Sequence, residues 1–293
     1  MSSTGTAGLE GLVVPRPPET SPRPQPIWDE SIVVAHDIVG TRYHRLTLRS
    51  PEIAATASAG QFVMVSVPES AGDRILLPRP MAIHRRRVDR GMIELIFNVV
   101  GRGTSALSTV ATGDRLLITG PLGRGFEIPE TAGSLLLIGR GIGVCAVMGA
   151  IEDAVAEGRP ATAVLSANTR SSIIGLEDCA ELGAHAIGVA DEDGTSAVAP
   201  LGARLRAEFA AAPPSAIMVC GSSRLTRLAA DLAAEWGVEA QVSLEAHMAC
   251  GIGYCHGCAA PVASADDTEG PLVCVDGPVF DVVTNRDAGA RAA

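Results

Sequence analysis

"SLLLIGRGIGVCAVMGAIEDAVAEGRPATAVLSAN", residues Ser134–Asn168, decides the fold class. It runs from an apolar strand through a glycine turn into an alanine-rich helix, and then into a second apolar strand. Strands that alternate with helices predict βαβ units and a parallel sheet. The alternation continues in "SAIMVCGSS" and "RLTRLAADLAAEWG", so we expect an α/β domain with a parallel sheet over residues 129–240.

The chain before this stretch has a different texture. Between Trp28 and Glu127 it consists of short apolar and β-branched runs such as "QFVMVSVPE" and "MIELIFNVV", with Gly, Pro and Asp between them. This spacing is typical of a small antiparallel barrel, so we expect a β-barrel domain over residues 28–128. The preceding residues 1–27 are rich in proline and poor in packing side chains, which predicts a disordered leader.

The bulk composition limits the possible partners. The 293 residues are 47% hydrophobic and carry a formal net charge of −10, which fits a globular protein and argues against a nucleic-acid partner. No run approaches the roughly 18 apolar residues of a membrane span, and the N-terminus lacks the pattern of a secretory signal. Seven cysteines, an odd number with four crowded at one end, favour a reducing, cytoplasmic setting.

One basic run, "HRRRVDR" (His84–Arg90), stands out against the negative net charge. We expect it at a solvated hairpin end, because charged side chains are usually exposed. Contact with an anion is the alternative interpretation.

The glycine turn of the opening stretch contains Gly139, Gly141 and Gly143. Small residues between a strand and a helix let a phosphate approach the backbone N–H groups at the start of that helix. The spacing here is G-x-G-x-G, with Arg140 inside the turn. A tight strand-to-helix connection without a ligand therefore explains the pattern equally well.

Two further positions in the barrel region suit a phosphate. Arg79 precedes Pro80, which cannot donate to a sheet ladder and so predicts an edge or a bulge, where an arginine can fork onto a phosphate. Gly103 and Thr104 stand at an expected helix start, where backbone N–H groups are free. A solvated arginine and an N-capping threonine would explain each singly, but together they suggest a pyrophosphate site.

Four cysteines form the pattern C-x4-C-x2-C-x15-C near the end of the chain. Plant-type [2Fe–2S] sites begin with the same C-x4-C-x2-C spacing. The intervening glycines supply exposed N–H groups, little bulk and access to positive φ angles. The cysteines are Cys250, Cys255, Cys258 and Cys274, and the glycines are Gly251, Gly253 and Gly257.

Other interpretations of these cysteines remain. A structural zinc site usually pairs two short Cys knuckles, and Cys274 has no cysteine neighbour, although His247 and His256 could be enlisted. Disulfides fit poorly with a reducing compartment. We expect a small cluster domain over residues 241–285, followed by a polar tail at 286–293. The remaining cysteines, Cys145, Cys179 and Cys220, are expected to be ordinary core residues.

With the motifs "LLPRPMAIHR", "GRGTSALS", "GPLGRGF" and "EAHMACGIGYCHGC…VCVDGPVF" in this order, the sequence resembles the electron-transfer subunits of the NAD-linked dihydroorotate dehydrogenases. These belong to the ferredoxin reductase-like superfamily, and the resemblance covers about residues 28–285. It implies FAD held between the barrel and an NAD-binding-like domain, and a [2Fe–2S] cluster on the four cysteines. The implied FAD contacts are Arg79, Pro80, Met81, Ala82, Ile96, Phe97, Asn98, Gly103 and Thr104.

The resemblance also implies the reaction and the partner. An FMN-containing dehydrogenase catalytic subunit would oxidise dihydroorotate within a hetero-oligomer, a heterotetramer, and electrons would pass through the cluster and FAD to NAD(P). This chain would need no catalytic acid, base or nucleophile of its own.

Several positions depart from the family pattern. Ala82 replaces a usual serine, Asn98 stands where arginine or another polar residue is common, and "GRGIGVCAV" and "CGSSRL" replace the usual "GGGIGVAPL" and "CGPxPM". Two alternatives follow. The chain could be the reductase subunit of another complex, such as a sulfide dehydrogenase, a hydrogenase or a ferredoxin–NADP+ oxidoreductase, or an assembly subunit that has lost its nicotinamide site.

Overall fold

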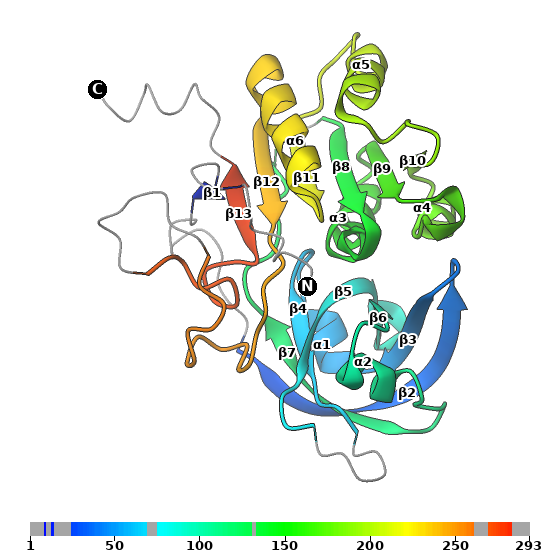
Figure 1. Ribbon diagram of the computed structural model, residues 1–293, viewed down its shortest axis with the longest axis vertical. Helices are drawn as coiled ribbons and strands as arrows, with labels where there is room; N and C mark the ends of the chain where they lie inside the picture. The colour runs from blue at the N-terminus through cyan, green and yellow to red at the C-terminus, as the bar shows by residue number, and fades with distance from the viewer. Residues whose placement is uncertain are drawn as a thin grey trace.

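The computed structural model describes residue 9 and residues 13–14, 25–68, 75–130, 133–260 and 269–282. A barrel lies below an α/β sheet, and the C-terminal segment runs along one side of both (Figure 1). Most of the leader expected at 1–27, and the whole tail expected at 286–293, lie outside the described residues. Within the leader, Leu9 is buried and Val13–Val14 form the short strand β1.

Six antiparallel strands close the predicted barrel, in the order β2-β3-β6-β5-β4-β7. Alternate apolar side chains, such as Leu46, Leu95 and Ile118, fill its interior and are fully buried. This alternation is what a half-buried sheet requires. The strands are β2 (Ile27–Val39), β3 (Tyr43–Arg49), β4 (Phe62–Val65), β5 (Arg79–Arg87), β6 (Met92–Asn98) and β7 (Arg115–Leu122). Short helices α1 (Pro51–Thr56) and α2 (Arg102–Leu107) and the 3-10 turn η1 (Val88–Arg90) connect them.

A second sheet has seven strands in the order β1-β13-β12-β11-β8-β9-β10. The five strands β12, β11, β8, β9 and β10 are parallel, as the βαβ pattern predicts. At one edge of the sheet, β13 pairs antiparallel with β12, and β1 pairs antiparallel with β13. The strands are β8 (Leu135–Arg140), β9 (Ala161–Ala167), β10 (His185–Ala190), β11 (Ala216–Cys220), β12 (Glu239–Ser243) and β13 (Val279–Val282).

Helices cover both faces of this sheet, which explains why its strands are continuously apolar. In β8, Leu135 and Leu137 face one apolar cluster, and Leu136 and Ile138 face another. The helix α3 lies between the sheet and the barrel (Figure 1). The helical elements are α3 (Val144–Ala156), α4 (Leu176–Leu182), α5 (Val198–Glu208) and α6 (Ser223–Trp236), with 3-10 turns η2 (Gly141–Gly143) and η3 (Arg170–Ser172). Among the described residues, none of the helices has both the length and the apolar character that a membrane crossing needs.

Only the second half of the basic run at His84–Arg90 is solvated as expected: Val88–Arg90 form the exposed turn η1 between β5 and β6, whereas the first half is buried or half-buried. His84 is 0% and Arg85 3% exposed, because the end of β5 packs against α3 and α4. Arg85 Nε donates to Glu152 of α3 at 2.6 Å, and its Nη1 donates to Glu181 of α4 at 2.9 Å. The anions that meet the basic run are therefore carboxylates of the chain itself, on α3, α4 and β6.

Asp178 of α4 is the centre of this ion-pair network. Its side chain is 2% exposed and accepts from Arg45 Nη2 at 2.7 Å, with His84 Nε2 at 3.2 Å. Burial opposes its ionisation, but the hydrogen bond and charge of His84 and the charges of Arg45 and Arg85 outweigh burial and hold the pKa of Asp178 below its ordinary value. The network therefore joins the barrel to the α/β unit through buried charges.

Removing the Asp178 charge should destabilise the fold. Asp178→Asn takes away the buried carboxylate that Arg45 and Arg85 face, so we expect a loss of about 3 kcal/mol of unfolding free energy at neutral pH. Arg206→Ala, which breaks an exposed pair with Glu235, should cost less than about 1 kcal/mol. Urea unfolding of the three proteins measures both values.

The difference in unfolding free energy between wild type and Asp178→Asn should depend on pH. Because the folded-state pKa of Asp178 is below its ordinary 3.8, the stabilisation is complete above that pH and is lost as the pH falls through the folded-state pKa. The difference in unfolding free energy between wild type and Asp178→Asn should thus become smaller at acidic pH. If this difference in unfolding free energy stayed constant from pH 7 to acidic pH, the stabilising role assigned to the Asp178 charge would be contradicted.

Candidate flavin and iron–sulfur sites

The barrel is split between β5 and β6 at one end. The two strands pair from Arg87↔Met92 to Ile83↔Leu95, and among the described residues no pair joins them beyond that point. Residues 79–82 of β5 pair only with β4, and residues 96–98 of β6 pair only with β3. The two runs expected to contact FAD are therefore the two facing edges of one gap, where backbone groups are free to bind a ligand.

Pro80 fits this arrangement. It lies opposite Met64 of β4, and its other side is the open edge of the split, where a missing N–H breaks no ladder bond. The sequence prediction of an edge position agrees with this register.

Side chains in the two runs alternate in direction. Met81 and Phe97 are 6% and 4% exposed and pack inside the barrel, so they can reach a ligand only through their backbone. Ala82 and Ile96 pack instead against the cluster that includes Tyr43 and α3, on the side of the α/β unit. Asn98 is half-buried at the end of β6. A ligand in the split would thus lie between the two units.

Arg79 and Gly103 meet at the mouth of the split. A Cβ on Gly103 would lie 2.3 Å from Arg79 Nε, so only glycine lets the guanidinium rest on the first turn of α2. Arg79 Nη1 donates to the carbonyl oxygens of Leu77 and Pro78 at 2.9 and 3.3 Å. Within the described part of the chain, its Nε and Nη2 donate to no protein acceptor, which leaves them for an anion such as a pyrophosphate.

The Thr104 hydroxyl has the capping role that the sequence analysis gave as the alternative. It accepts from the backbone N–H groups of Val100 and Gly101 at 2.9 and 3.2 Å, and donates to the Gly101 carbonyl at 3.1 Å. The hydroxyl therefore closes the turn before α2. Only the backbone of Thr104 remains available to a phosphate.

Gly103→Ala tests this part of the site. The added methyl must push the Arg79 guanidinium away, so we expect the Kd for FAD to rise at least about tenfold, equivalent to about 1.4 kcal/mol. The matched control is Gly101→Ala in the same turn, where a Cβ meets nothing within 4 Å and FAD binding should be unchanged. Titration of the apoprotein with FAD measures both, and equal affinities would contradict the proposed contact.

The four C-terminal cysteines are arranged as two pairs. The backbone N–H of Cys255 donates to Cys250 Sγ at 3.4 Å, and that of Cys274 donates to Cys258 Sγ at 3.5 Å. The first pair lies toward solvent, with Cys255 exposed, whereas Cys258 and Cys274 are 3% and 2% exposed. All seven cysteines of the chain are free, so the disulfide interpretation does not hold.

The pairing favours two iron atoms over one zinc. A tetrahedral zinc with Zn–S bonds of about 2.3 Å would hold all four sulfur atoms within about 4 Å of one another. Among the described residues, which include all four cysteines, no three of these sulfur atoms come within 4.8 Å of one another. Two separate pairs are what a [2Fe–2S] cluster needs, because each iron takes two thiolates.

The cysteine thiols differ in how readily they ionise. Burial opposes ionisation of Cys250, but backbone N–H groups around it outweigh burial and lower its pKa to about 6. Burial and the neighbouring Cys258 raise the pKa of Cys274 to about 12. Two buried thiols this close can both be thiolates only if a metal ion compensates their charge.

Two of the three loop glycines are required by the geometry. Gly251 and Gly253 have φ angles of 73° and 83°, and a Cβ on them would lie 2.6 Å from Met64 Cγ and Val275 Cγ2 respectively. At Gly257 the φ angle is not positive, and a Cβ would make only an ordinary contact at 3.7 Å, so glycine is not required there. Its neighbour His256 takes a positive φ of 58° instead, and its exposed ring bonds Glu269 at 2.7 Å.

Gly253→Ala and Gly257→Ala form a matched test of this loop. Gly253→Ala combines a positive φ with a clash against Val275, so we expect most of the iron and acid-labile sulfide to be lost. Gly257→Ala should keep both. Iron, sulfide and zinc analysis, with EPR of the dithionite-reduced proteins, measures this, and zinc in place of sulfide would contradict the cluster assignment.

Arg140 is directed away from the glycine turn. Its guanidinium donates to Asn168 Oδ1 at 2.6 Å, to Ser166 Oγ at 2.9 Å and to both carboxylate oxygens of Asp191 at 2.6 and 3.2 Å. Arg224 of α6 also donates to Asp191, at 2.6 Å. These contacts cross the carboxyl ends of β8, β9 and β10, the edge where open α/β sheets bind ligands. Sequence reasoning found Arg140 but not its partners, which are far along the chain.

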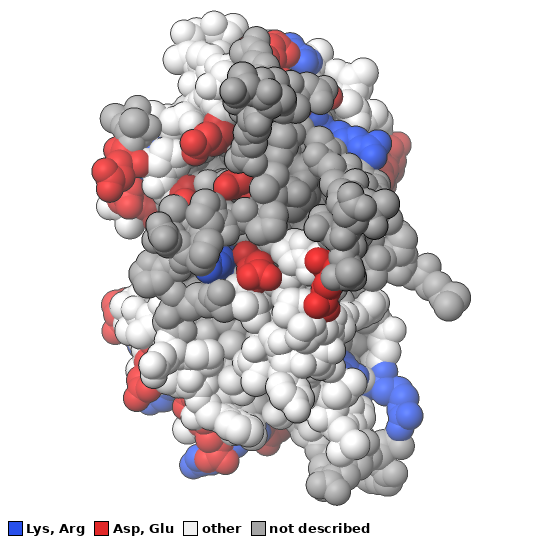
Figure 2. All heavy atoms as spheres, turned by 90° about the vertical axis from the view of Figure 1, so that its left-hand side faces the viewer, with Lys and Arg blue, Asp and Glu red and all other residues white. Residues whose placement is uncertain are grey.

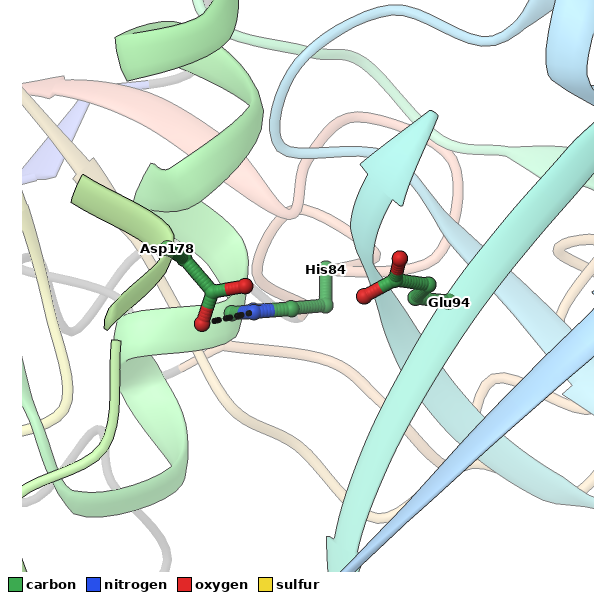
Figure 3. Close-up of side chains that lie close together, drawn as sticks. All are labelled: His84, Glu94 and Asp178. Atoms are coloured by element: carbon green, nitrogen blue, oxygen red, sulfur yellow. Dashed lines mark ion pairs between the residues drawn. The ribbon is translucent and has the colours of Figure 1, made fainter. Parts of the chain in front are cut away.

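One buried group of metal-ligating side chains lies at the domain junction. His84, Glu94 and Asp178 come from β5, β6 and α4 and have ligand atoms within 4.8 Å of one another (Figure 3). Arg45 lies 2.7 Å from Asp178 and 3.7 Å from Glu94. Arginines already pair with both carboxylates, Arg45 and Arg85 with Asp178 and Arg87 with Glu94, so this group is part of the ion-pair network and not a metal site.

The split barrel, the parallel sheet beside it and the module of paired cysteines define a ferredoxin reductase-like flavoprotein with its own iron–sulfur domain. Two domain families match the chain: "Oxidoreductase FAD-binding domain" at residues 29–126 and "Iron-sulfur cluster binding domain of dihydroorotate dehydrogenase B" at residues 245–284. A dihydroorotate dehydrogenase B (NAD+) electron transfer subunit from Bacillus caldolyticus is 31% identical over 251 residues, covering 85% of this chain and 94% of the relative. The chain belongs to the family of dihydroorotate dehydrogenase B (NAD+) electron transfer subunits.

Other similar proteins agree with this assignment. The electron transfer subunit of Desulforamulus reducens is 28% identical over 254 residues, covering 87% of this chain and 96% of the relative. The NADH-dependent reduced ferredoxin-NADP oxidoreductase shares the fold, with a TM-score of 0.71 at 24% identity over 88% of this chain and 91% of that chain. Phthalate dioxygenase reductase shares it at a TM-score of 0.56 and 16% identity, covering 71% and 65% of the two chains.

Proposed function

We propose that this chain relays electrons between a dihydroorotate dehydrogenase catalytic subunit that contains FMN and the nicotinamide cofactor NAD. The observation that carries the proposal is the pairing of the four cysteines within the segment that matches the dihydroorotate dehydrogenase B cluster domain. FAD in the barrel split would exchange a hydride with NAD and single electrons with the cluster. Seven free thiols suit a reducing compartment, and we place the complex in the cytoplasm.

The chain's own residues bind and orient the two groups. Arg79 and the backbone of Gly103 would hold the pyrophosphate of FAD, and the free edges of residues 79–82 and 96–98 would bind the flavin ring. The four cysteines would hold the cluster. Backbone N–H groups aimed at their sulfur atoms, such as Gly253 N to Cys274 Sγ at 3.2 Å, stabilise added negative charge and so favour the reduced cluster.

The surface near the cluster loop suits a protein partner. Ile252 and Tyr254 stand between the first two cysteines and are 58% and 87% exposed. Figure 2 looks at the side of the molecule that bears this segment, and it shows scattered acidic side chains around a broad uncharged area. Exposed apolar side chains at a redox group favour docking. Both residues were overlooked in the sequence analysis, although two large apolar residues in a glycine-rich loop already indicate a contact surface.

Reconstitution with the native catalytic subunit tests the function. We expect the complex to reduce NAD+ while it oxidises dihydroorotate, and to contain FMN and FAD in equal amounts. A complex that forms orotate only with an artificial acceptor would show that NAD is not the partner of this chain.

Tyr254→Asp should weaken assembly of that complex. A carboxylate in place of an aromatic anchor costs buried contact and places a charge in the interface, so we expect at least about a tenfold rise in Kd for the catalytic subunit. Val88→Asp, a change at a 59% exposed apolar residue of the barrel, is the control and should leave assembly intact. Analytical ultracentrifugation measures the Kd, and FAD and iron contents confirm that both variants are loaded.

The alternative function of a ferredoxin–NADP+ oxidoreductase has a structural neighbour in its favour. The ferredoxin-NADP oxidoreductase neighbour covers 88% of this chain at a TM-score of 0.71, which shows a common fold. Fold similarity at this identity does not assign a reaction. The dihydroorotate dehydrogenase B cluster family matched at residues 245–284 favours the first function.

A further inference from the structure

A small crevice opens at the carboxyl ends of β11 and β12. It is lined by Leu9, Gly221, Ser222, Thr226 and residues 242–245. Its free volume is about 10 Å³, close to the room that one water molecule takes. A nicotinamide ring cannot enter the crevice in this state.

One of the side chains that line the crevice, Leu9, comes from the N-terminal part of the chain. Leu9 is 4% exposed and belongs to the same apolar cluster as Leu225, Val242 and Leu244. Burial of a leucine among aliphatic side chains is favourable, so this contact holds the segment on the sheet. Leu9 therefore acts as a hydrophobic anchor in the crevice.

A short strand fastens the same segment to the edge of the sheet. Val13–Val14 (β1) pairs antiparallel with β13, with Val13 opposite Val282 and Val14 opposite Asp281. Two residues of pairing give few hydrogen bonds, each of modest net value, so the segment can leave the sheet without disrupting it. The FAD-binding family matches from residue 29 on, which places the anchor outside the matched domains.

The crevice adjoins the point where this type of sheet binds nucleotides. The chain passes from β8 to β9 and β10 on one side and then returns to β11 on the other side of β8. Ligands bind outside the carboxyl ends of the strands at such a switch point. The two turns there are in close contact, since a Cβ on Gly221 would lie 2.4 Å from the Arg140 carbonyl oxygen and one on Gly143 2.8 Å from the Cys220 carbonyl carbon. A ring entering beside Gly221 and Ser222 would need the space that Leu9 occupies.

We propose that Leu9 is a displaceable plug of the pyridine-nucleotide site, so that the Leu9 side chain must leave the crevice before NAD(H) binds. The proposal rests on the proposed use of NAD by this chain. A site that is open for only a fraction of the time has its apparent affinity reduced by that fraction. Arg140, Asp191 and Arg224 border the same strand ends on the other side of the switch point and are not part of the plug.

Leu9→Asp in the full-length, cofactor-loaded protein tests the plug, because a carboxylate is unfavourable in the apolar cluster to which Leu9 belongs. We expect its KM for NADH in flavin reduction to fall at least about fivefold with kcat unchanged. Leu9→Met, which keeps an apolar plug, is the matched control and should behave as wild type. Hydrogen exchange of the peptides covering residues 221–226 and 242–245 gives a readout that needs no NADH, and it should become several-fold faster in Leu9→Asp alone.

The outcomes separate the plug from the proposed function. Unchanged exchange together with an unchanged KM would overturn the plug while NADH still reduces the flavin. Faster exchange in Leu9→Asp, with no flavin reduction by NADH in any variant, would show that Leu9 covers the crevice but would overturn both the use of NAD and the role of Leu9 in controlling it. Unchanged exchange without any reduction by NADH would overturn both.

Discussion

Buried charge between the barrel and the α/β unit is the constraint on which the rest of the structure depends. Arg85 is 3% exposed and Asp178 2%, so neither can exchange its partner for water without a large desolvation cost. Apolar contacts alone would let α3 slide along β5, because hydrophobic attraction has no direction. Ion pairs from Arg85 to Glu152 and Glu181 permit one register only. They thereby fix where the flavin gap lies relative to the nucleotide-binding edge.

The two halves of the strand β5 have different roles. A bulge between Ile83 and Arg85 separates its two halves. Residues 84–87 after the bulge carry the ion pairs, whereas residues 79–82 before it leave β6 and form one edge of the split. A bulge redirects side chains and twists the strand locally. One strand thus both anchors the neighbouring unit and opens the barrel toward it.

Local sequence patterns predicted the parts of the structure that depend on local spacing. The barrel, the parallel sheet and the cysteine cluster follow from periodicity and from C-x4-C-x2-C, because each is set by residues close in the chain. The first half of the basic run was wrongly assigned to solvent because its partners Glu152 and Asp178 lie on helices far downstream, and nothing in "HRRRVDR" indicates them. Gly257 was expected to supply a positive φ that His256 takes instead. The FAD residues named from the resemblance stay predictions, but their two runs face each other across the split.

The two cysteine pairs differ in environment, and this difference gives the cluster module a direction. Cys255 is exposed beside Tyr254, whereas Cys258 and Cys274 lie in an apolar cluster with Met64 and Leu122 of the barrel strands. One iron would therefore face a protein partner and the other the body of the chain. Electron transfer weakens steeply with distance, so a partner docked at Tyr254 reaches the outer pair while the inner pair stays dry. The proposed nucleotide site lies instead at the carboxyl ends of β8 and β11, so the proposed partner and the nucleotide would contact different segments of the chain.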